Sequence, residues 1–416
     1  MDGNSTYGSK KKYSSFYSMG IGWNLHNEAF LKGNDVINML RLKTSYGETG
    51  AASGALETDA YTYYTYNTNN RYMAFNGAVL GGLGNPNLTW QLTKEFNIGT
   101  EFGLYDNRVR GTFEYYIKNT NNLLSSMDMP LTMGFPSYRA NIGEVQNRGW
   151  EASLQAYIIR DRARQFNWLI GGQLVYNKNK ITKLSQAIKD QTEAYMISDA
   201  MKPYEDTGSG IQNLFYEGYP QHSIYAVRSL GIDPGSGNEI YLDRDGNITD
   251  VWKESNKVYC GTTDPKYRGN LNTMVQWKDF TFNASFGYYW GGQMYNATLR
   301  DRVEVRTETI RNQNVDERVL NSRWYEVGDV VFFKKLNNNF SKATSRYVMD
   351  NNVLELQSIS LQYKLHNTYL ENTFKLQSII FGINANSLIH WGSIKMERGT
   401  SYPFARNVQA SVKLLF

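Results

Sequence analysis

Residues 279–289 read DFTFNASFGYY, and this stretch decides the fold class of the chain. Every second residue is apolar, in the order Phe280, Phe282, Ala284, Phe286 and Tyr288. The residues between them include Thr281, Asn283 and Ser285. Because successive side chains of a β-strand point to opposite faces, the alternation predicts a strand with one apolar and one polar face.

The same alternation recurs in 96–104, 108–118, 148–158 and the last ten residues. A soluble β-sandwich also shows apolar and polar faces, so the length of the strands and their connections must separate the two cases. These segments reach nine or more residues, and a tilted membrane-spanning strand needs about 9–11. The strand length therefore favours a membrane barrel.

The connections between these segments fall into two sizes. Three are short, at 106–107, 161–165 and 278–279. Others are long and polar, at 48–87, 119–147, 180–209, 232–267 and 289–352. Short turns at one end and long loops at the other are typical of outer-membrane barrels. We therefore expect an all-β fold, a transmembrane antiparallel β-barrel with short periplasmic turns and long extracellular loops.

The strand count indicates a part of such a barrel. We expect about thirteen strands, near 16–25, 39–47, 88–104, 108–118, 148–159, 166–178, 210–216, 222–231, 268–277, 279–288, 353–364, 375–385 and 405–416. In 353–364 the apolar phase slips between Leu356 and Ile359, which predicts a β-bulge. Single-chain bacterial barrels close with an even number of strands. An odd count therefore predicts that the barrel is incomplete in this chain.

Composition excludes several other classes. The net charge of +5 is mild for 416 residues, and no Lys/Arg-rich tract indicates nucleic-acid binding. The single Cys260 excludes an intramolecular disulfide framework. The first residues, MDGNSTYGSKKKYSSF, lack the apolar core of a signal peptide. A nucleophile elbow, a P-loop and paired-cysteine zinc spacing are also missing from the sequence, so we expect no enzyme.

An ordered series of motifs resembles the C-terminal part of SusC/RagA-type TonB-dependent outer-membrane transporters of Bacteroidetes. The series comprises DGNS at 2–5, LRLKTSYGETG at 40–50, NPNLTWQ at 85–91, KEFNIG at 94–99, NIGEVQNRGWE at 141–151, ERGTSYPFAR at 397–406 and the terminal Phe416. The resemblance runs along the whole chain and implies a multi-pass barrel of the outer membrane.

The resemblance also implies a function and partners. Transporters of this class have roughly 22 strands and a plugged lumen, so residues 1–416 would be the later part, without the signal peptide, TonB box, plug and early strands. The function implied is import of glycans or peptides with a SusD-like surface lipoprotein, powered by TonB-ExbB-ExbD. Two alternatives remain: a secreted or surface β-rich glycan-binding protein without transport, and a β-rich glycoside hydrolase, which would need paired carboxylates.

Aromatic side chains supply the first candidate sites. They lie in a long loop and at one strand end, and comprise Tyr61, Tyr63, Tyr64, Tyr66, Tyr289 and Trp290. Aromatic faces stack on sugar rings or pack on peptide side chains. The alternative is an aromatic girdle at the membrane interface or packing against a partner protein.

Charged side chains supply two further candidates. Five are expected on inward faces, to line a translocation path or to hold the plug: Arg108, Arg110, Glu114, Lys118 and Glu151. Three carboxylates, Asp243, Asp245 and Asp250, could hold calcium in a glycine-containing loop. An ordinary Asp-Gly-Asn turn explains the same residues without a metal, and we expect no other cofactor.

Overall fold

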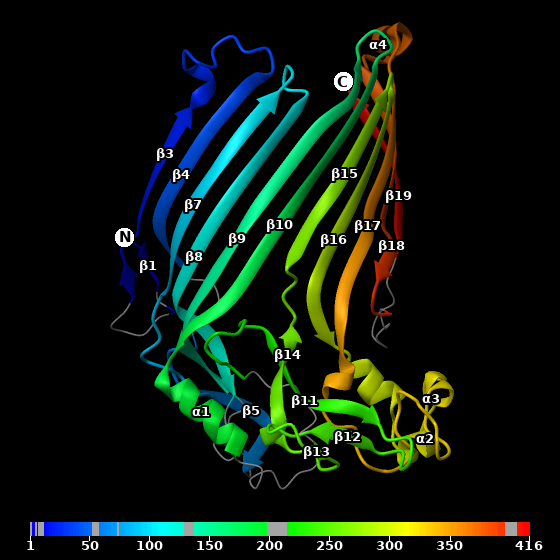
Figure 1. Ribbon diagram of the computed structural model, residues 1–416. Helices are drawn as coiled ribbons and strands as arrows, with labels where there is room; N and C mark the ends of the chain where they lie inside the picture. The colour runs from blue at the N-terminus through cyan, green and yellow to red at the C-terminus, as the bar shows by residue number, and fades with distance from the viewer. Residues whose placement is uncertain are drawn as a thin grey trace.

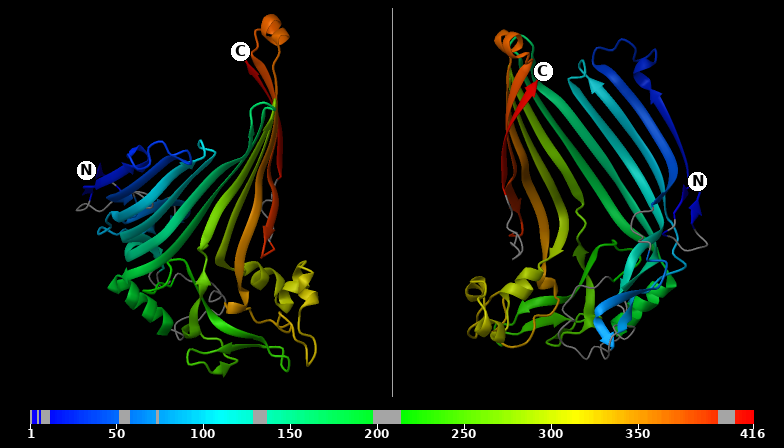
Figure 2. Two further views of the ribbon diagram at one scale, coloured as in Figure 1. Left: turned by 45° about the horizontal axis from the view of Figure 1, so that its top comes forward. Right: turned by 180° about the vertical axis from the view of Figure 1, so that it is seen from behind.

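The computed structural model describes residues 2–4, 6, 12–51, 58–72, 75–128, 137–197, 214–395 and 406–416. Eleven strands form one antiparallel sheet that follows the chain from β3 at one edge to β19 at the other. Figures 1 and 2 show that the sheet is twisted and curved into a trough. The strands are β3 (Tyr17–Asn24), β4 (Ile37–Ala51), β7 (Gln91–Leu104), β8 (Val109–Asp128), β9 (Ser137–Asp161), β10 (Phe166–Leu184), β15 (Tyr267–Trp277), β16 (Phe280–Tyr295), β17 (Val348–Leu365), β18 (Ser378–Gly392) and β19 (Asn407–Leu415).

The two ends of the sheet differ as the sequence predicts. At the turn end, residues 105–108, 162–165 and 278–279 connect successive strands, and α4 (Thr368–Phe374) follows β17. The turns use left-handed backbone at Asn107, Gln165 and Lys278, where φ is 57°, 50° and 50°. At the loop end lie the long connections (Figure 1, bottom).

The loop end carries most of the helices and three small sheets. The helical segments there are α1 (Gln186–Ile197), η3 (Glu254–Asn256), η4 (Leu299–Val303), α2 (Thr307–Asn312), α3 (Arg318–Asn321) and η5 (Ser345–Tyr347). The small sheets pair β1 (Asp2–Gly3) with β2 (Tyr13–Ser14), pair β5 (Tyr63–Tyr72) with β6 (Phe75–Gly82), and order four strands as β13-β12-β11-β14. These four are β11 (Ser223–Ile232), β12 (Glu239–Leu242), β13 (Ile248–Thr249) and β14 (Lys257–Thr262). At the turn end, η1 (Leu25–Asn27) follows β3.

Eleven of the expected strand ranges are strands of the large sheet, and the expected bulge is confirmed. Gln357 has no partner in the register of β17 with β16 or with β18, because both ladders skip from Leu356 to Ser358. One extra residue reverses the face of every later side chain, which explains the phase slip between Leu356 and Ile359.

One expected barrel strand is wrong, and a second lies mostly outside the described residues. Range 222–231 forms β11, but this strand belongs to the four-stranded sheet of the loop end, because Ile224, Tyr225, Ala226 and Val227 are all buried and leave no polar face. In range 210–216, residues 210–213 lie outside the described residues. Residues 214–216 are not a strand, and Leu214 and Phe215 are buried in the loop-end core.

The expected loop at 119–147 is also mostly strand, since β8 continues to Asp128 and β9 begins at Ser137. These extensions carry the sheet beyond the alternating segments toward the loop end. There they enclose an apolar cluster that caps this region of the sheet, formed by Leu123, Ala140, Val145, Ile181, Leu184, Ile188 and Phe215.

Among the described residues, no helix combines the length and the apolar character that crossing a membrane requires.

Candidate functional site

Along most of its length the large sheet has one mainly apolar and one mainly polar face. Cross-strand register preserves the alternation, since Phe282 on β16 faces Leu361 on β17 and Asn283 faces Ser360. The apolar face is unusually open: Ile98 is 49%, Leu154 50% and Ile383 55% exposed. A continuous exposed apolar face is stable only against an apolar environment.

A row of five aromatic residues crosses the apolar face toward the loop end. Its members are directly opposite one another on β8, β9, β10, β15 and β16: Tyr115, Trp150, Tyr176, Tyr267 and Trp290. Ring centroids along the row lie 6.0 Å apart for Trp150–Tyr176, 5.2 Å for Tyr176–Tyr267 and 5.4 Å for Tyr267–Trp290. We call this the upper aromatic row; it lies nearer the loop end, which Figure 1 draws at the bottom.

A second row crosses the same face at the turn end. This lower aromatic row consists of the directly opposite residues Phe166, Trp277, Phe280, Tyr363 and Phe381. On β15 the two rows are ten positions apart, from Tyr267 to Trp277, and on β16 they are again ten apart, from Phe280 to Trp290. Ten residues at about 3.4 Å each, tilted by about 45°, span about 24 Å along the membrane normal. This matches the apolar band of an outer-membrane barrel, about 25 Å tall between two aromatic girdles.

Charged side chains cluster on the polar face of β4, β7 and β8, with one member on β9. We call them the charged patch: Arg41, Lys43, Glu95, Glu101, Arg110, Glu114, Lys118 and Glu151. Lys43 Nζ lies 3.0 Å from Glu101 Oε1 and also contacts Glu114, and Lys118 Nζ lies 3.1 Å from Glu95 Oε1. Four of the five charged residues that the sequence singles out therefore share one patch.

Two features of the charged patch bear on its stability. Glu114 and Glu151 lie directly opposite each other, a like-charge pair that is unfavourable unless it is compensated. The contact of Lys43 with Glu114 provides the compensation. The fifth predicted residue, Arg108, lies in the turn before β8 instead. Its Nε and Nη2 donate to the carbonyls of Tyr157 and Ile158 at 2.8 and 2.6 Å, so it fastens the end of β9.

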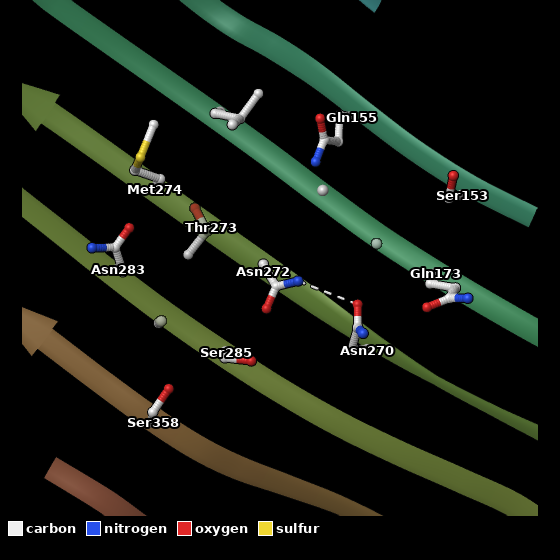
Figure 3. A pocket seen from close by; sticks show the side chains of 14 residues that line it. Ser153, Gln155, Gln173, Asn270, Asn272, Thr273, Met274, Asn283, Ser285 and Ser358 are labelled. Atoms are coloured by element: carbon white, nitrogen blue, oxygen red, sulfur yellow. Dashed lines mark hydrogen bonds between the residues drawn. The ribbon is translucent and has the colours of Figure 1, made fainter. Parts of the chain in front are cut away.

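Next to the charged patch lies an uncharged region that sequence reasoning missed. A hollow of about 460 Å³ opens on β9, β10, β15, β16 and β17, and none of the fourteen residues lining it is charged (Figure 3). We call its polar side chains the neutral patch: Ser153, Gln155, Gln173, Asn270, Asn272, Asn283, Ser285 and Ser358. Asn272 Nδ2 donates to Asn270 Oδ1 at 3.2 Å. The signal was a pair of alternating small polar residues on each of two neighbouring strands, Asn270 and Asn272 on β15 and Asn283 and Ser285 on β16.

The predicted aromatic residues separate into three positions. Tyr63, Tyr64 and Tyr66 lie on β5 at the loop end, just after Tyr61, and all four are exposed. Trp290 belongs to the upper aromatic row, which supports the girdle interpretation for that residue. Its neighbour Tyr289 lies on the polar face, opposite Arg268 and Val353.

The predicted calcium ligands lie in and after the turn between β12 and β13. Asp243 Oδ1 accepts a hydrogen bond from the Asn247 backbone N–H at 2.7 Å, and Oδ2 accepts one from the Asn247 side chain at 3.1 Å. These bonds lower the pKa of Asp243. Across the described ranges, no three or more His, Cys, Asp or Glu side chains are grouped to hold a metal ion, Asp245 and Asp250 included. The geometry is that of an Asp-Gly-Asn turn whose ends are joined by the Asp243 side chain.

A second hollow, of about 280 Å³, continues the polar face toward the loop end. It lies between Asn177 and Asn179 of β10 and the loop residues His222 and Asp264. His222 Nδ1 is 2.9 Å from Asp264 Oδ1. This hydrogen bond raises the pKa of His222, against the opposing effect of partial burial.

A buried ionic cluster joins the two longest connections of the loop end. Arg346 donates to Glu239 of β12 at 2.9 Å and to Glu304, which follows η4, at 2.5 Å. Thr344 and Ser341 each donate to one of these carboxylates at 2.8 Å. Burial alone would raise the pKa of Glu304, but the Arg346 guanidinium holds it below its usual value. Removing one member of such a cluster costs about 3–5 kcal/mol.

The two aromatic rows, the lipid-facing band and the polar inner face define a wall segment of an outer-membrane β-barrel. Comparison with known proteins identifies the family. A family model described as "TonB dependent receptor-like, beta-barrel" matches residues 2–300, and the chain belongs to this family.

Individual relatives agree with this assignment. TonB-dependent receptor P3 of Formosa agariphila is 28% identical over 413 residues, covering 93% of this chain and 38% of that protein. TonB-dependent receptor SusC of Bacteroides thetaiotaomicron is 25% identical over 384 residues, covering 90% of this chain and 36% of that protein. The solved structure of the "RagAB peptide transporter" superposes with a TM-score of 0.76 at 25% identity, and the match covers 94% of this chain and 41% of that one. The expected SusC/RagA type and outer-membrane location are thereby confirmed. The chain spans about two fifths of the length of these relatives.

Proposed function

We propose that this chain forms wall, lumen lining and outer loops of a transporter that imports a glycan or a peptide. A SusD-like lipoprotein covers the loop end and delivers the ligand. TonB-ExbB-ExbD supplies energy through an N-terminal part of the whole transporter. The work is binding and gating, so we assign no catalytic residue and no cofactor.

The observation that carries the proposal is the neutral patch. A wall with only a structural role needs polar side chains on its inner face, but not a hollow lined by side-chain amides and hydroxyls. Amides such as Asn270, Asn272 and Gln173 donate and accept hydrogen bonds at once. They therefore match sugar hydroxyls and peptide groups equally well, which is why both ligand classes belong to the proposal.

The loop-end tyrosines extend the proposal to ligand capture. Tyr64 is 66% and Tyr66 79% exposed on β5. Exposed aromatic rings at the outer mouth offer flat apolar surfaces, and their hydroxyl groups can hold polar atoms of the same ligand. Such rings suit either the ligand or the covering lipoprotein.

Uptake by living cells tests the proposal. A strain without the gene is compared with strains carrying the wild type or the pair Asn272→Trp and Asn283→Trp, which fills the hollow. We expect labelled oligosaccharides or peptides to enter with the wild type only, and entry to stop when the proton gradient is dissipated. Normal uptake of every tested ligand by the deletion strain would refute the proposal.

The control for this experiment lies on the other face of the same strand. Phe282→Trp alters the apolar face of β16, and we expect it to leave uptake unchanged. Comparable losses from Phe282→Trp and from the Asn272→Trp, Asn283→Trp pair would attribute the effect to general damage of the wall.

A further inference from the structure

The apolar face changes character directly beyond the upper aromatic row. On β9, Arg148 lies on the same face as Trp150, two residues closer to the loop end. On β10, Lys178 lies on the same face as Tyr176, also two residues closer to the loop end. Lys180 is the next residue of β10 on that face. We call Arg148, Lys178 and Lys180 the basic cluster, and all three side chains are exposed.

The cluster is an arrangement that a strand pair does not favour by itself. Arg148 and Lys178 lie directly opposite each other in the β9–β10 ladder. Like charges in directly opposite positions are destabilising. Among the residues that the structure describes, no carboxylate forms an ion pair with any of the three. The next carboxylate on this face of β9, Glu144, lies 3.9 Å from Lys183. The described part of the chain therefore leaves this positive charge uncompensated.

The position of the cluster indicates what compensates it. The upper aromatic row marks the boundary between the apolar band and the headgroup layer. Two residues of tilted strand, at about 3.4 Å each and about 45°, place the cluster about 5 Å beyond this boundary. Basic side chains at this depth face lipid headgroups, whereas Leu154 and Leu174 on the same face lie within the band.

We propose that the basic cluster binds a phosphorylated lipid headgroup of the outer leaflet, with the acyl chains along the apolar face of β9 and β10. Arg148 supplies planar, bidentate recognition of a phosphate group, and the two lysines add ammonium donors. The bound phosphate removes the repulsion between Arg148 and Lys178. The site is on the outside of the wall and is independent of the transported ligand.

Lipid binding to the protein purified from the outer membrane in mild detergent tests the proposal. Purified lipid A is titrated, and the dissociation constant is measured by native mass spectrometry. We expect the triple exchange Arg148→Gln, Lys178→Gln, Lys180→Gln to weaken binding on the order of 100-fold. The conservative variant Lys178→Arg, Lys180→Arg should bind as the wild type does, and inorganic phosphate should not displace the lipid.

A charge-matched control separates the site from a general electrostatic effect. Arg244→Gln, Lys253→Gln, Arg311→Gln removes the same charge from exposed loop-end positions. We expect its affinity to stay within about two-fold of the wild type. If the triple variant does not fold, Lys180→Gln alone should weaken binding about five-fold. Unchanged lipid A binding in the cluster variants, or an equal loss in the control, would overturn the proposal.

Discussion

The charged patch and the neutral patch lie side by side on one face of one sheet, yet they satisfy their polar groups differently. In the charged patch, Lys43 contacts both Glu101 and Glu114, so the side chains hold one another. In the neutral patch the described contacts are isolated amide and hydroxyl hydrogen bonds, such as Asn283 Nδ2 to Ser360 Oγ at 3.2 Å.

This difference indicates different partners. Ion pairs are oriented by fixed charges and suit a surface that meets one stationary, complementary partner. Amide hydrogen bonds exchange with those of water or ligand at a net cost of only about 1 kcal/mol each. The charged patch therefore suits a lasting contact inside the lumen, and the neutral patch suits a ligand that must pass.

Charge reversal in the charged patch should have the largest effect. Lys43→Glu removes two half-exposed ion pairs and places a fourth carboxylate near Glu101, Glu114 and Glu151. We expect the free energy of unfolding to fall by about 2 kcal/mol, since each exposed pair contributes up to about 1 kcal/mol. The measurement is the temperature at which the folded band disappears in a gel-shift assay. Adding Glu114→Lys should restore most of the loss, and a fully stable Lys43→Glu variant would contradict the pairing.

Charge introduced into the neutral patch should affect passage more than stability. Asn270→Asp with Asn272→Asp replaces two donors by carboxylates that only accept and must be desolvated. We expect ligand uptake to fall about ten-fold, because one unsatisfied polar group costs about 1–3 kcal/mol. The free energy of unfolding should stay within about 0.5 kcal/mol of the wild-type value. The uncharged control, Asn270→Ser with Asn272→Ser, should keep most of the uptake. Equal uptake by both pairs would remove the distinction between the patches.

Loss of a single pair at the edge of the charged patch should be smaller. Lys118→Gln breaks the contact with Glu95, and we expect a loss of about 0.5 kcal/mol. Salt screens half-exposed charges, with a Debye length of about 3 Å at 1 M. The difference between variant and wild type, measured by thermal unfolding, should therefore vanish in high salt. A difference that persists there would indicate a packing effect.

The smallest effect should come from pH at the edge of the second hollow. The pKa of His222 is raised in the folded protein by Asp264, so this contact stabilises fully below the unfolded pKa of about 6.5 and is lost as pH rises through the folded value. We expect the protection factors of the Gln221 and His222 amides, which are the ratios of the intrinsic to the observed exchange rate at each pH, to fall about two-fold from about pH 6 to about pH 8. His222→Gln should abolish this dependence, and an unchanged slope would exclude His222 as its source.

Local pattern predicted the wall because alternation is a property of each strand alone. The stretch 279–289 places Phe280 and Asn283 on opposite faces in any register. The change in the phase of the apolar residues near Gln357 likewise indicates the bulge from the sequence of that strand alone. Alternation also places four of the five charged residues that were predicted to face inward on the polar face of the sheet. The exception, Arg108, precedes β8 and lies in a turn, where alternation does not apply.

What the sequence did not reveal depends on register between distant segments. The neutral patch combines five strands, and Asn272 meets Ser285 only through the β15–β16 ladder. The aromatic rows likewise arise from register, with Trp150 opposite Tyr176. At the loop end, residues 224–227 of β11 are apolar on both faces, so alternation does not apply there and burial in the loop-end core decides where the strand lies. Arg346 and Glu239 meet across 107 residues, beyond any local signal.

The central claim is that one face of this sheet contacts lipid and the other faces the lumen, and neighbouring residues of β16 test it most directly. In a Cys260→Ser background, Ser285→Cys and Phe286→Cys are each labelled with a fluorophore, and the protein is placed in bilayers containing brominated lipid. We predict strong quenching at position 286 and weak quenching at position 285. Equal quenching at both positions, or stronger quenching at 285, would contradict the assignment of the two faces.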